Sequence, residues 1–433
     1  MRKFVLLTLF ALVASAGPGL AADLVTKAKK APPPPVSWWD TVTITGHVEA
    51  GFTLNSVNPP DGVNFGHLFT DKANRLVLNQ SVLTIQRPLD PKATDYDFGF
   101  KVQTMYGSDA RATQFLGEFA YSIDSINQFN IVEAHGLAHL PWLTSGGVDL
   151  KFGHYVTLEG AEVIYAPDNP LYSHSYIFNF GIPFKHTGIM TTTHVNETVD
   201  IYAGVDTGVN TTFGNNGLPS RNNGDNNKAV AFHGGIGLNN LLNGALTILA
   251  TTHIGPENPD TLGTRVACGC DPNSALRYLN DITATWKVTD KLTLITDLNY
   301  IRDDGFRADG YGVAQYVVYT INDWLKIAGR GEIWRDNNGF FVAAFPGHFD
   351  FVNLELGLPN GSYGGGRTTY GALTVGLTMT PPVPINPFGI KQIIMRPEVR
   401  YDTSLNNTTP FATGTKKSQF TFGGDIIVPF TWK

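Results

Sequence analysis

Apolar and polar residues alternate along most of the chain, and the clearest example is the run from Thr41 to Asn55. Every second residue from Val42 to Leu54 is apolar or glycine, and nearly all residues between them are polar. Because successive side chains of a β-strand point to opposite faces, this run predicts a strand with one apolar and one polar face. Strands of soluble proteins usually have about 5–6 residues, whereas a strand that crosses a bilayer needs about 9–11. The run is therefore long enough for a membrane strand.

The same alternation recurs as far as the C-terminus and predicts an all-β chain. In a soluble sandwich the polar face would be the outer one, but in a transmembrane barrel the apolar face meets lipid and the polar face lines water. Strand length favours a transmembrane antiparallel β-barrel of about 16 strands, and it leaves about 14 or 18 open. The predicted strands span residues 41–55, 74–87, 96–106, 128–140, 147–155, 185–195, 198–207, 228–238, 244–253, 275–287, 292–302, 311–321, 324–335, 368–380, 391–402 and 417–432.

The connections between these strands alternate in length. Short turns are expected at 89–94, 288–291 and 322–323. Longer segments rich in Gly, Asn and Pro are expected at 56–70, 208–227, 255–274 and 336–367. Short turns at one end and long loops at the other are typical of outer-membrane barrels, which have periplasmic turns and external loops. An even number of strands places both ends of the barrel in the periplasm.

The N-terminus has the order of a secretory signal peptide. Arg2 and Lys3 precede the apolar stretch Phe4–Val13, and small residues follow as far as Ala22. A membrane anchor is the alternative, but the stretch is shorter than the roughly 20 residues of a spanning helix. We therefore predict a signal peptide at 1–22, a Pro-rich periplasmic spacer at 23–40, which contains four consecutive prolines, and a barrel at 41–433.

Composition agrees with a barrel and excludes some partners. Charged residues make up 16% of the chain, against about 25% in typical soluble domains. The formal net charge of −6 argues against a nucleic-acid partner. The two cysteines, Cys268 and Cys270, are expected to form a local disulfide in an exposed loop, since no second pair stands at zinc-like spacing. The 11 histidines show no H-E-x-x-H spacing, so no metal or cofactor is predicted.

The last predicted strand has the form expected of a barrel's closing strand. Phe420, Phe422, Phe430 and Trp432 alternate with polar residues. Such a terminal aromatic strand is similar to the recognition signal for the barrel-assembly machinery, which we name as a partner together with outer-membrane lipid. Lys433 follows Trp432 and departs from that signal.

Several motifs between about residues 75 and 210 resemble one known family. They include Tyr96–Phe100 followed by Met105–Ala110, and Leu150–Tyr155 followed by a run from Gly160 to Ile164. The most specific are Asn169–Tyr176 and Gly181–Gly188. These motifs resemble those of the putative β-barrel porin-2 family, the OmpL-like porins. The resemblance implies an outer-membrane barrel.

The segment Val156–Phe184 follows the fifth predicted strand. In general porins the loop at this place folds into the lumen and narrows the pore, and by analogy we expect the same here. Its aromatic residues would pack inside a barrel, and its carboxylates and histidine would contact solutes. The alternative is an external loop that its aromatics hold together. The expected constriction residues are Glu159, Glu162, Asp168, Tyr172, His174 and Tyr176.

Charged residues on the polar faces of other strands are candidates for the pore wall. They are Lys101, Lys151, Arg330, Glu332, Arg396, Glu398 and Arg400. Rings of opposite charge across a constriction would produce a transverse field that screens solutes. The alternative is mutual ion pairing along the wall, and the two can coexist.

The predicted function is an outer-membrane porin that allows passive diffusion of small hydrophilic solutes and ions, as a homotrimer or a monomer. A substrate-specific channel, for example for sugars, and a surface-binding or structural barrel are the alternatives. An enzyme is not expected. The run His174-Ser175-Tyr176 lacks the signature of a barrel phospholipase, and alternation would point Asp303 and Asp304 to opposite faces.

Overall fold

The computed structural model describes residues 37–114, 116, 118–119, 126–213, 224–342, 366–382, 390 and 392–432. The predicted signal peptide and most of the predicted spacer lie outside these residues. Residues 1–41 and 42–433 form two separate units. In the first, Trp38–Thr41 forms a 3-10 turn, η1. None of the helices in the described part is long and apolar enough to cross a membrane.

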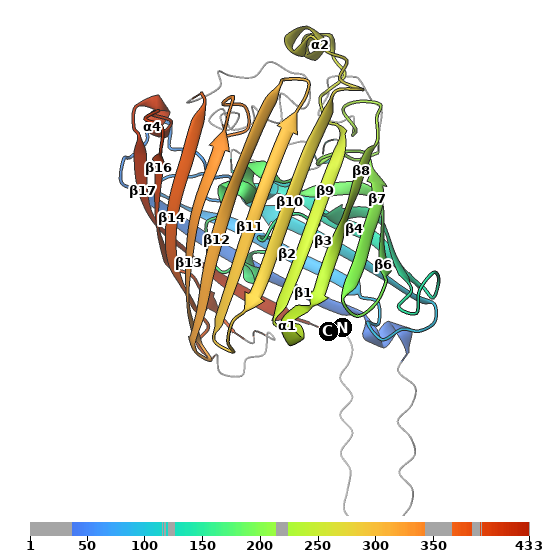
Figure 1. Ribbon diagram of the computed structural model, residues 1–433. Coiled ribbons are helices and arrows are strands. Elements are labelled where there is room, and N and C mark those ends of the chain that lie inside the picture. The colour runs from blue at the N-terminus through green and yellow to red at the C-terminus, as the bar shows by residue number, and fades with distance from the viewer. Residues whose placement is uncertain are drawn as a thin grey trace, which may run out of the picture. The chain divides into compact units, whose positions relative to one another are not determined.

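Strands dominate the second unit and form a single antiparallel sheet in its described part. The sheet closes on itself because β1 pairs with both β2 and β17 (Figure 1). The strands are β1 (Thr43–Asn55), β2 (Arg75–Arg87), β3 (Asp97–Gly107), β4 (Gln128–Leu140), β5 (Val148–Val156), β6 (Lys185–His194), β7 (Val199–Asp206), β8 (Ala231–Asn240), β9 (Leu246–Pro256), β10 (Leu276–Lys287), β11 (Leu292–Asp303), β12 (Ala308–Asn322), β13 (Leu325–Asp336), β14 (Thr368–Met379), β15 (Ile394–Met395), β16 (Glu398–Ser404) and β17 (Ser418–Thr431).

Two of these strands, β15 and β16, share one place in the wall. Both pair with β14 on one side and with β17 on the other. The barrel therefore has 16 positions with one broken strand, which confirms the predicted count. The prediction of an unbroken strand over 391–402 is wrong. The break falls at Arg396 and Pro397, and the physical reason is that proline has no N–H to donate to the ladder.

The connections have the predicted asymmetry. The tight turn labelled α1 (Leu241–Gly244) lies at one end of the barrel, and α2 (Leu262–Cys268) and α4 (Phe411–Gly414) lie at the other (Figure 1). The four residues between β11 and β12 are an exception, because they form a short turn at the long-loop end. The predicted disulfide between Cys268 and Cys270 is present and joins the last residue of α2 to the residue two positions on.

The two faces of the wall follow the alternation in the sequence. On β1, Val48 is 42% exposed on the outside, whereas the neighbouring His47 is 0% exposed on the inside. The inside also contains an apolar cluster, which the polar faces of the strands do not predict. Phe65 and Phe69 from the loop after β1 join Phe178 and Phe184 in it. Aromatic side chains of a loop gain from burial, so this loop turns into the barrel mouth.

Candidate functional site: a segment docked on the inner wall

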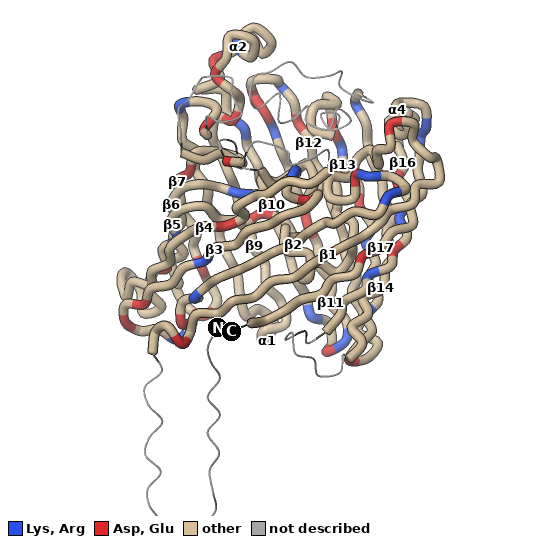
Figure 2. The backbone as a smooth tube through the Cα atoms, turned by 180° about the vertical axis from the view of Figure 1, so that it is seen from behind, with Lys and Arg blue, Asp and Glu red and all other residues tan. Residues whose placement is uncertain are grey.

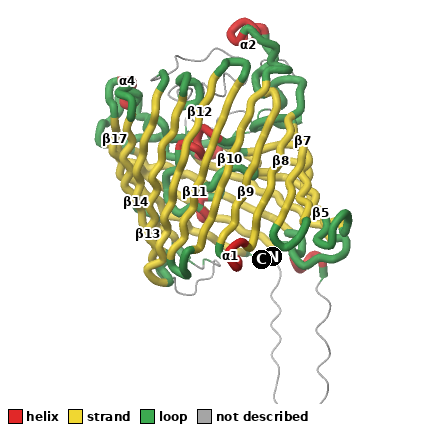
Figure 3. Tube along the Cα trace, viewed as in Figure 1, coloured by secondary structure: helices red, strands yellow, loops and turns green. Residues whose placement is uncertain are grey.

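Residues 157–184, which we call the inward segment, leave the wall after β5 and return to it as β6. The segment contains the helical turns η3 (Ala166–Asp168) and η4 (Ile177–Gly181), which lie inside the ring of strands (Figure 3). Its start docks on β10 and β11. There the backbone N–H of Gly160 donates to Asp281, and that of Ala161 donates to Asp297, each at a distance of 3.0 Å.

Three buried arginines hold the middle of the segment on the opposite wall, at β13 and at the broken strand. Arg396 donates to the carbonyl oxygens of Ala166 at 2.7 Å and Asn169 at 2.9 Å. Arg330 donates to the carbonyl of Ser173 at 2.7 Å. Arg400 donates to the carbonyl of His174 at 2.6 Å. Irregular backbone inside a barrel needs such partners, because unpaired carbonyls are costly to bury.

Wall carboxylates accept from the N–H groups of the same stretch. Glu398 binds the N–H of Tyr172 at 2.9 Å and of Ser173 at 3.1 Å. Glu332 binds the N–H of Tyr176 at 2.6 Å. The broken strand contributes to this arrangement, since Arg396 lies at the break and Glu398 directly follows it. Charged partners make these hydrogen bonds stronger than neutral ones, so the segment is fixed along its length.

Aromatic residues complete the docking. The hydroxyl of Tyr176 donates to Asp402 at 3.1 Å, and its ring stacks on Tyr370 with centroids 4.9 Å apart. The hydroxyl of Tyr172 donates to Asn79 at 3.2 Å and lies directly over Gly51. A Cβ at position 51 would stand 2.4 Å from that hydroxyl oxygen, so only glycine leaves room for it.

His174 lies between the segment and the loop after β1. Its ring stacks on Phe178 at 4.3 Å and lies 4.6 Å from the ring of Phe69. Burial lowers the pKa of His174 well below its usual value, and the charges of Arg330 and Arg396 lower it further. The imidazole is therefore neutral and acts as a packing group at this point.

Five of the six expected constriction residues are buried: Glu159, Glu162, Tyr172, His174 and Tyr176. The sixth, Asp168, is exposed. Glu162 pairs with Arg330 at 2.7 Å and accepts from the N–H of Ser175 at 2.7 Å. The structure thus brings Glu162, Tyr172, His174 and Tyr176 together on the arginine-bearing wall.

Glu159 stands apart from that group, on the β10–β11 side. Neither of its carboxylate oxygens has a hydrogen-bond partner among the described residues. Burial raises the pKa of Glu159 well above its usual range, and the negative charges of Asp281, Asp206 and Asp297 raise it further. Both effects favour the neutral, protonated form of its carboxyl.

The expected wall residues separate into two groups. The first, on β13 and the broken strand, shows the mutual pairing considered from sequence, with Arg330 3.1 Å from Glu332 and Arg400 2.8 Å from Asp402. The second lies on β3 and β5, on the other side of the ring. There Lys101 pairs with Glu133 at 2.5 Å, and its side chain keeps 27% exposure.

Lys151, the other lysine of that group, is half-buried. Its ammonium lies 5.7 Å from the centre of the Tyr155 ring. Asp281 and Asp297 were not among the residues that the sequence indicated for the site. Alternation indicates that they face inward, but only the closed ring shows which groups they meet.

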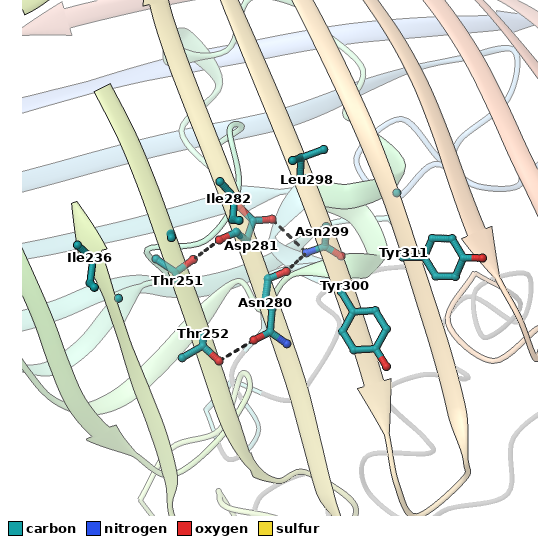
Figure 4. A pocket seen from close by; sticks show the side chains of 13 residues that line it. Ile236, Thr251, Thr252, Asn280, Asp281, Ile282, Leu298, Asn299, Tyr300 and Tyr311 are labelled. Carbon is teal, nitrogen blue, oxygen red and sulfur yellow. Dashed lines mark hydrogen bonds between the residues drawn. The ribbon is translucent and has the colours of Figure 1, made fainter. Parts of the chain in front are cut away.

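The outer wall carries a groove of about 560 Å³ over β8–β12. Figure 4 shows Asn280 and Thr252 side by side in it, with the Thr252 hydroxyl donating to the Asn280 amide oxygen at 2.9 Å. Asp281 and Asn299 bond to each other at 3.1 Å on the inner side. Apolar and aromatic side chains frame the groove, namely Ile236, Ile282, Leu298, Tyr300 and Tyr311.

Comparison with known proteins decides the family. Residues 41–430 match the model of the family described as putative beta-barrel porin-2, OmpL-like. The chain belongs to this family. It is a porin channel of the bacterial outer membrane, and its alternating strands are the membrane-crossing elements. No curated protein sequence matches the porin.

Solved structures share its fold. The outer-membrane channel DcaP of Acinetobacter baumannii is 12% identical, with a TM-score of 0.52 over 90% of this chain and 97% of that one. An anion-selective porin from Comamonas acidovorans is 9% identical, with a TM-score of 0.53 over 90% of this chain and 99% of that one. At these identities the likeness concerns the fold alone.

Proposed function

We propose that this porin passes small hydrophilic solutes by passive diffusion and selects them mainly by size, with the inward segment narrowing the lumen. The observation that carries this proposal is the course of the segment, which leaves the wall at β5 and docks on β13 and the broken strand at the opposite side of the ring. A segment that crosses the interior reduces the cross-section open to solutes.

Charge pairing on the inner wall supports selection by size over selection by charge. Figure 2 shows positive and negative residues close together around β13, β16 and β17. The pairs include Arg87–Asp97 at 2.6 Å, Lys101–Glu133 at 2.5 Å, Arg277–Asp303 at 3.0 Å and Arg330–Glu162 at 2.7 Å. Paired charges produce a weaker field across a lumen than separate rings of one sign do.

The candidate residues take two roles in this proposal. The buried group of Glu162, Tyr172, His174 and Tyr176 holds the segment in place. Asp168, Lys101 and Lys151 keep contact with solvent and meet the solute. A sugar-specific track would need accessible aromatic faces, and burial of Tyr172 and Tyr176 disfavours that alternative.

Liposome swelling with neutral sugars of graded size tests the proposal. We expect the swelling rate to fall steadily with solute size, to rise linearly with solute concentration, and to be similar for stereoisomers of one mass. Saturation with concentration, or a strong preference for one sugar among isomers, would instead show a substrate-specific channel.

We also propose that the porin has no enzymatic activity. The porin family and fold point to a channel. The adjacent carboxylates Asp303 and Asp304 have different ion-pair partners. Asp303 pairs with the buried Arg277, whereas Asp304 pairs with the partly exposed Arg302 at 2.6 Å. Incubation with phospholipid and peptide substrates should release no product above that of a heat-denatured sample.

For partners, we propose a homotrimer and insertion by the barrel-assembly machinery. In the outer-wall groove the amide nitrogen of Asn280 has no hydrogen-bond partner among the described residues. An unsatisfied polar group facing lipid costs several kcal/mol, roughly, and a second chain against the groove would relieve that cost. At the end of β17, Trp432 is 83% exposed and available for recognition during assembly.

A further inference from the structure

Four neighbouring strands place three histidines and one aspartate together on the inner wall. His186 lies on β6, Asp206 on β7, His233 on β8 and His253 on β9. His233 and His253 are directly opposite each other in the ladder. The ring centroid of His186 lies 4.4 Å from that of His233 and 4.7 Å from that of His253. The cluster lies where long loops follow β7 and β9.

Asp206 is the centre of the cluster. One of its oxygens, Oδ1, lies 3.0 Å from Nε2 of His253, and the other, Oδ2, lies 3.2 Å from Nδ1 of His186. Two ligands that bind a tetrahedral zinc ion at about 2.0–2.1 Å stand about 3.3 Å apart. One ligand atom from each of His186, Asp206 and His253 lies within 4.8 Å of the ligand atoms of the other two, so small side-chain movements would bring all three around one ion.

The histidines are buried without a full set of partners. His186, His233 and His253 are each 0% exposed. Nε2 of His186 and both ring nitrogens of His233 have no hydrogen-bond partner among the described residues. Buried polar atoms are nearly always satisfied in native proteins, and an exception requires an explanation.

We propose that His186, Asp206 and His253 bind a divalent transition metal, with His233 supplying a further ligand. Imidazole nitrogens and a carboxylate are the donors that zinc and its neighbours in the first transition row prefer. Alkaline-earth ions prefer all-oxygen sites, so the nitrogen donors select against them.

A supporting residue stands behind the proposed ligands. Oε1 of Glu257 lies 3.7 Å from Nδ1 of His253, and its Oε2 accepts from the N–H of Val209 at 2.7 Å. Closing this 3.7 Å gap would let Glu257 support the far ring nitrogen of His253, as carboxylates commonly do in metal sites. A bound ion would join four strands and thereby stiffen the end of the wall from which the loops after β7 and β9 emerge.

The sequence does not reveal this site. The ligands are separated by 20 residues between His186 and Asp206 and by 47 between Asp206 and His253, which is why the spacing of the histidines predicted no metal. Only strand pairing in the closed wall brings them together.

Metal content of the whole folded porin tests the proposal. The protein is folded into detergent with Zn²⁺ present, dialysed against metal-free buffer, and analysed by mass spectrometry for zinc. We expect about one Zn²⁺ per chain in the wild type and at least about tenfold less in His253→Gln and Asp206→Asn. The matched control is His47→Gln, which changes a buried inner-wall histidine bonded to Gln80 at 2.9 Å and should retain the zinc.

Two further measurements keep the test decisive if a variant does not fold. A chelator should lower the melting temperature of the wild type, and Zn²⁺ should restore it. Bound Co²⁺ should give a visible absorption spectrum of a nitrogen-ligated ion. Zinc below about a tenth of an equivalent in the wild type, or equal zinc in His253→Gln and the wild type, would overturn the proposal.

Discussion

Arg330 shows how single residues hold the inward segment. It is 0% exposed and binds Glu162, Glu332 and the carbonyl of Ser173. Removing one partner of a buried ion pair leaves the other charge uncompensated, at a cost of about 3–5 kcal/mol. Such a residue is a stability determinant as well as a candidate wall charge.

The change Arg330→Met should therefore lower the free energy of unfolding by about 3–5 kcal/mol. Denaturant titration in detergent, followed by tryptophan fluorescence, measures it. The matched control is Arg302→Met, which breaks the largely solvent-exposed pair with Asp304 and should cost at most about 1 kcal/mol. Equal losses in the two variants would mean that Arg330 does not anchor the segment.

Glu159 gives the barrel a pH dependence of predictable sign. Its folded pKa lies above the unfolded value, so the stability that the protonated carboxyl contributes is fully present below the unfolded pKa of about 4.3. It is lost as the pH rises from there through the folded pKa. Ionisation at higher pH would place a charge beside Asp281 and Asp297.

As the pH rises from 4 to 8, the free energy of unfolding of Glu159→Gln should increase relative to that of the wild type by about 1 kcal/mol or more. Denaturant titrations of both proteins at the two pH values give the difference. Glu197→Gln, at an exposed turn position, should show no such change. If the free energies of unfolding of the wild type and Glu159→Gln differ by the same amount at both pH values, the buried, protonated state of Glu159 is refuted.

At the scale of elements, alternation predicted the wall closely. The strand predicted at 128–140 has those bounds in β4, and the one predicted at 74–87 begins one residue later, at Arg75 in β2. Inward and outward faces follow from a period of two. The break at Arg396 and Pro397 was missed because the alternating residues continue across it.

The site was predicted less completely than the wall. Position after the fifth strand and aromatic content predicted a segment that folds inward, and residues 157–184 lie inside the ring. Its binding partners could not be predicted, since strand register and closure determine which wall residues lie opposite. The burial of Glu159 follows from that docking and not from the residues around it in sequence.

The inward segment can be tested as an element. Deletion of Asn169–Phe178 removes the stretch that binds Arg330 and Arg400 and should widen the lumen, so single-channel conductance should rise. Deletion of Leu262–Cys270, which contains α2 and both cysteines of the disulfide, shortens a loop at the barrel end by a similar length and should leave conductance unchanged. An unchanged conductance in the first variant, when heat-modifiability shows a folded barrel, would place the segment outside the conducting path.

At the scale of the whole molecule, the outer wall bears on association. Asn280 is a polar residue in the outer-wall groove, and most of the other residues that line the groove are apolar. We expect the detergent-extracted porin to be a trimer and Asn280→Leu to shift it toward monomer, as measured by size exclusion with light scattering. Thr104→Leu, at the outward position opposite Leu83 on another part of the wall, should leave the trimer intact. A monomeric wild type would contradict the proposed association.

As a porin, this barrel should contain a water-filled path that runs past the docked segment. Single-channel recording of the purified porin in planar bilayers tests it most directly. We expect discrete, ohmic current steps from the folded protein and none from the heat-denatured sample. Pure, folded protein that inserts into the bilayer without producing any current steps would contradict it.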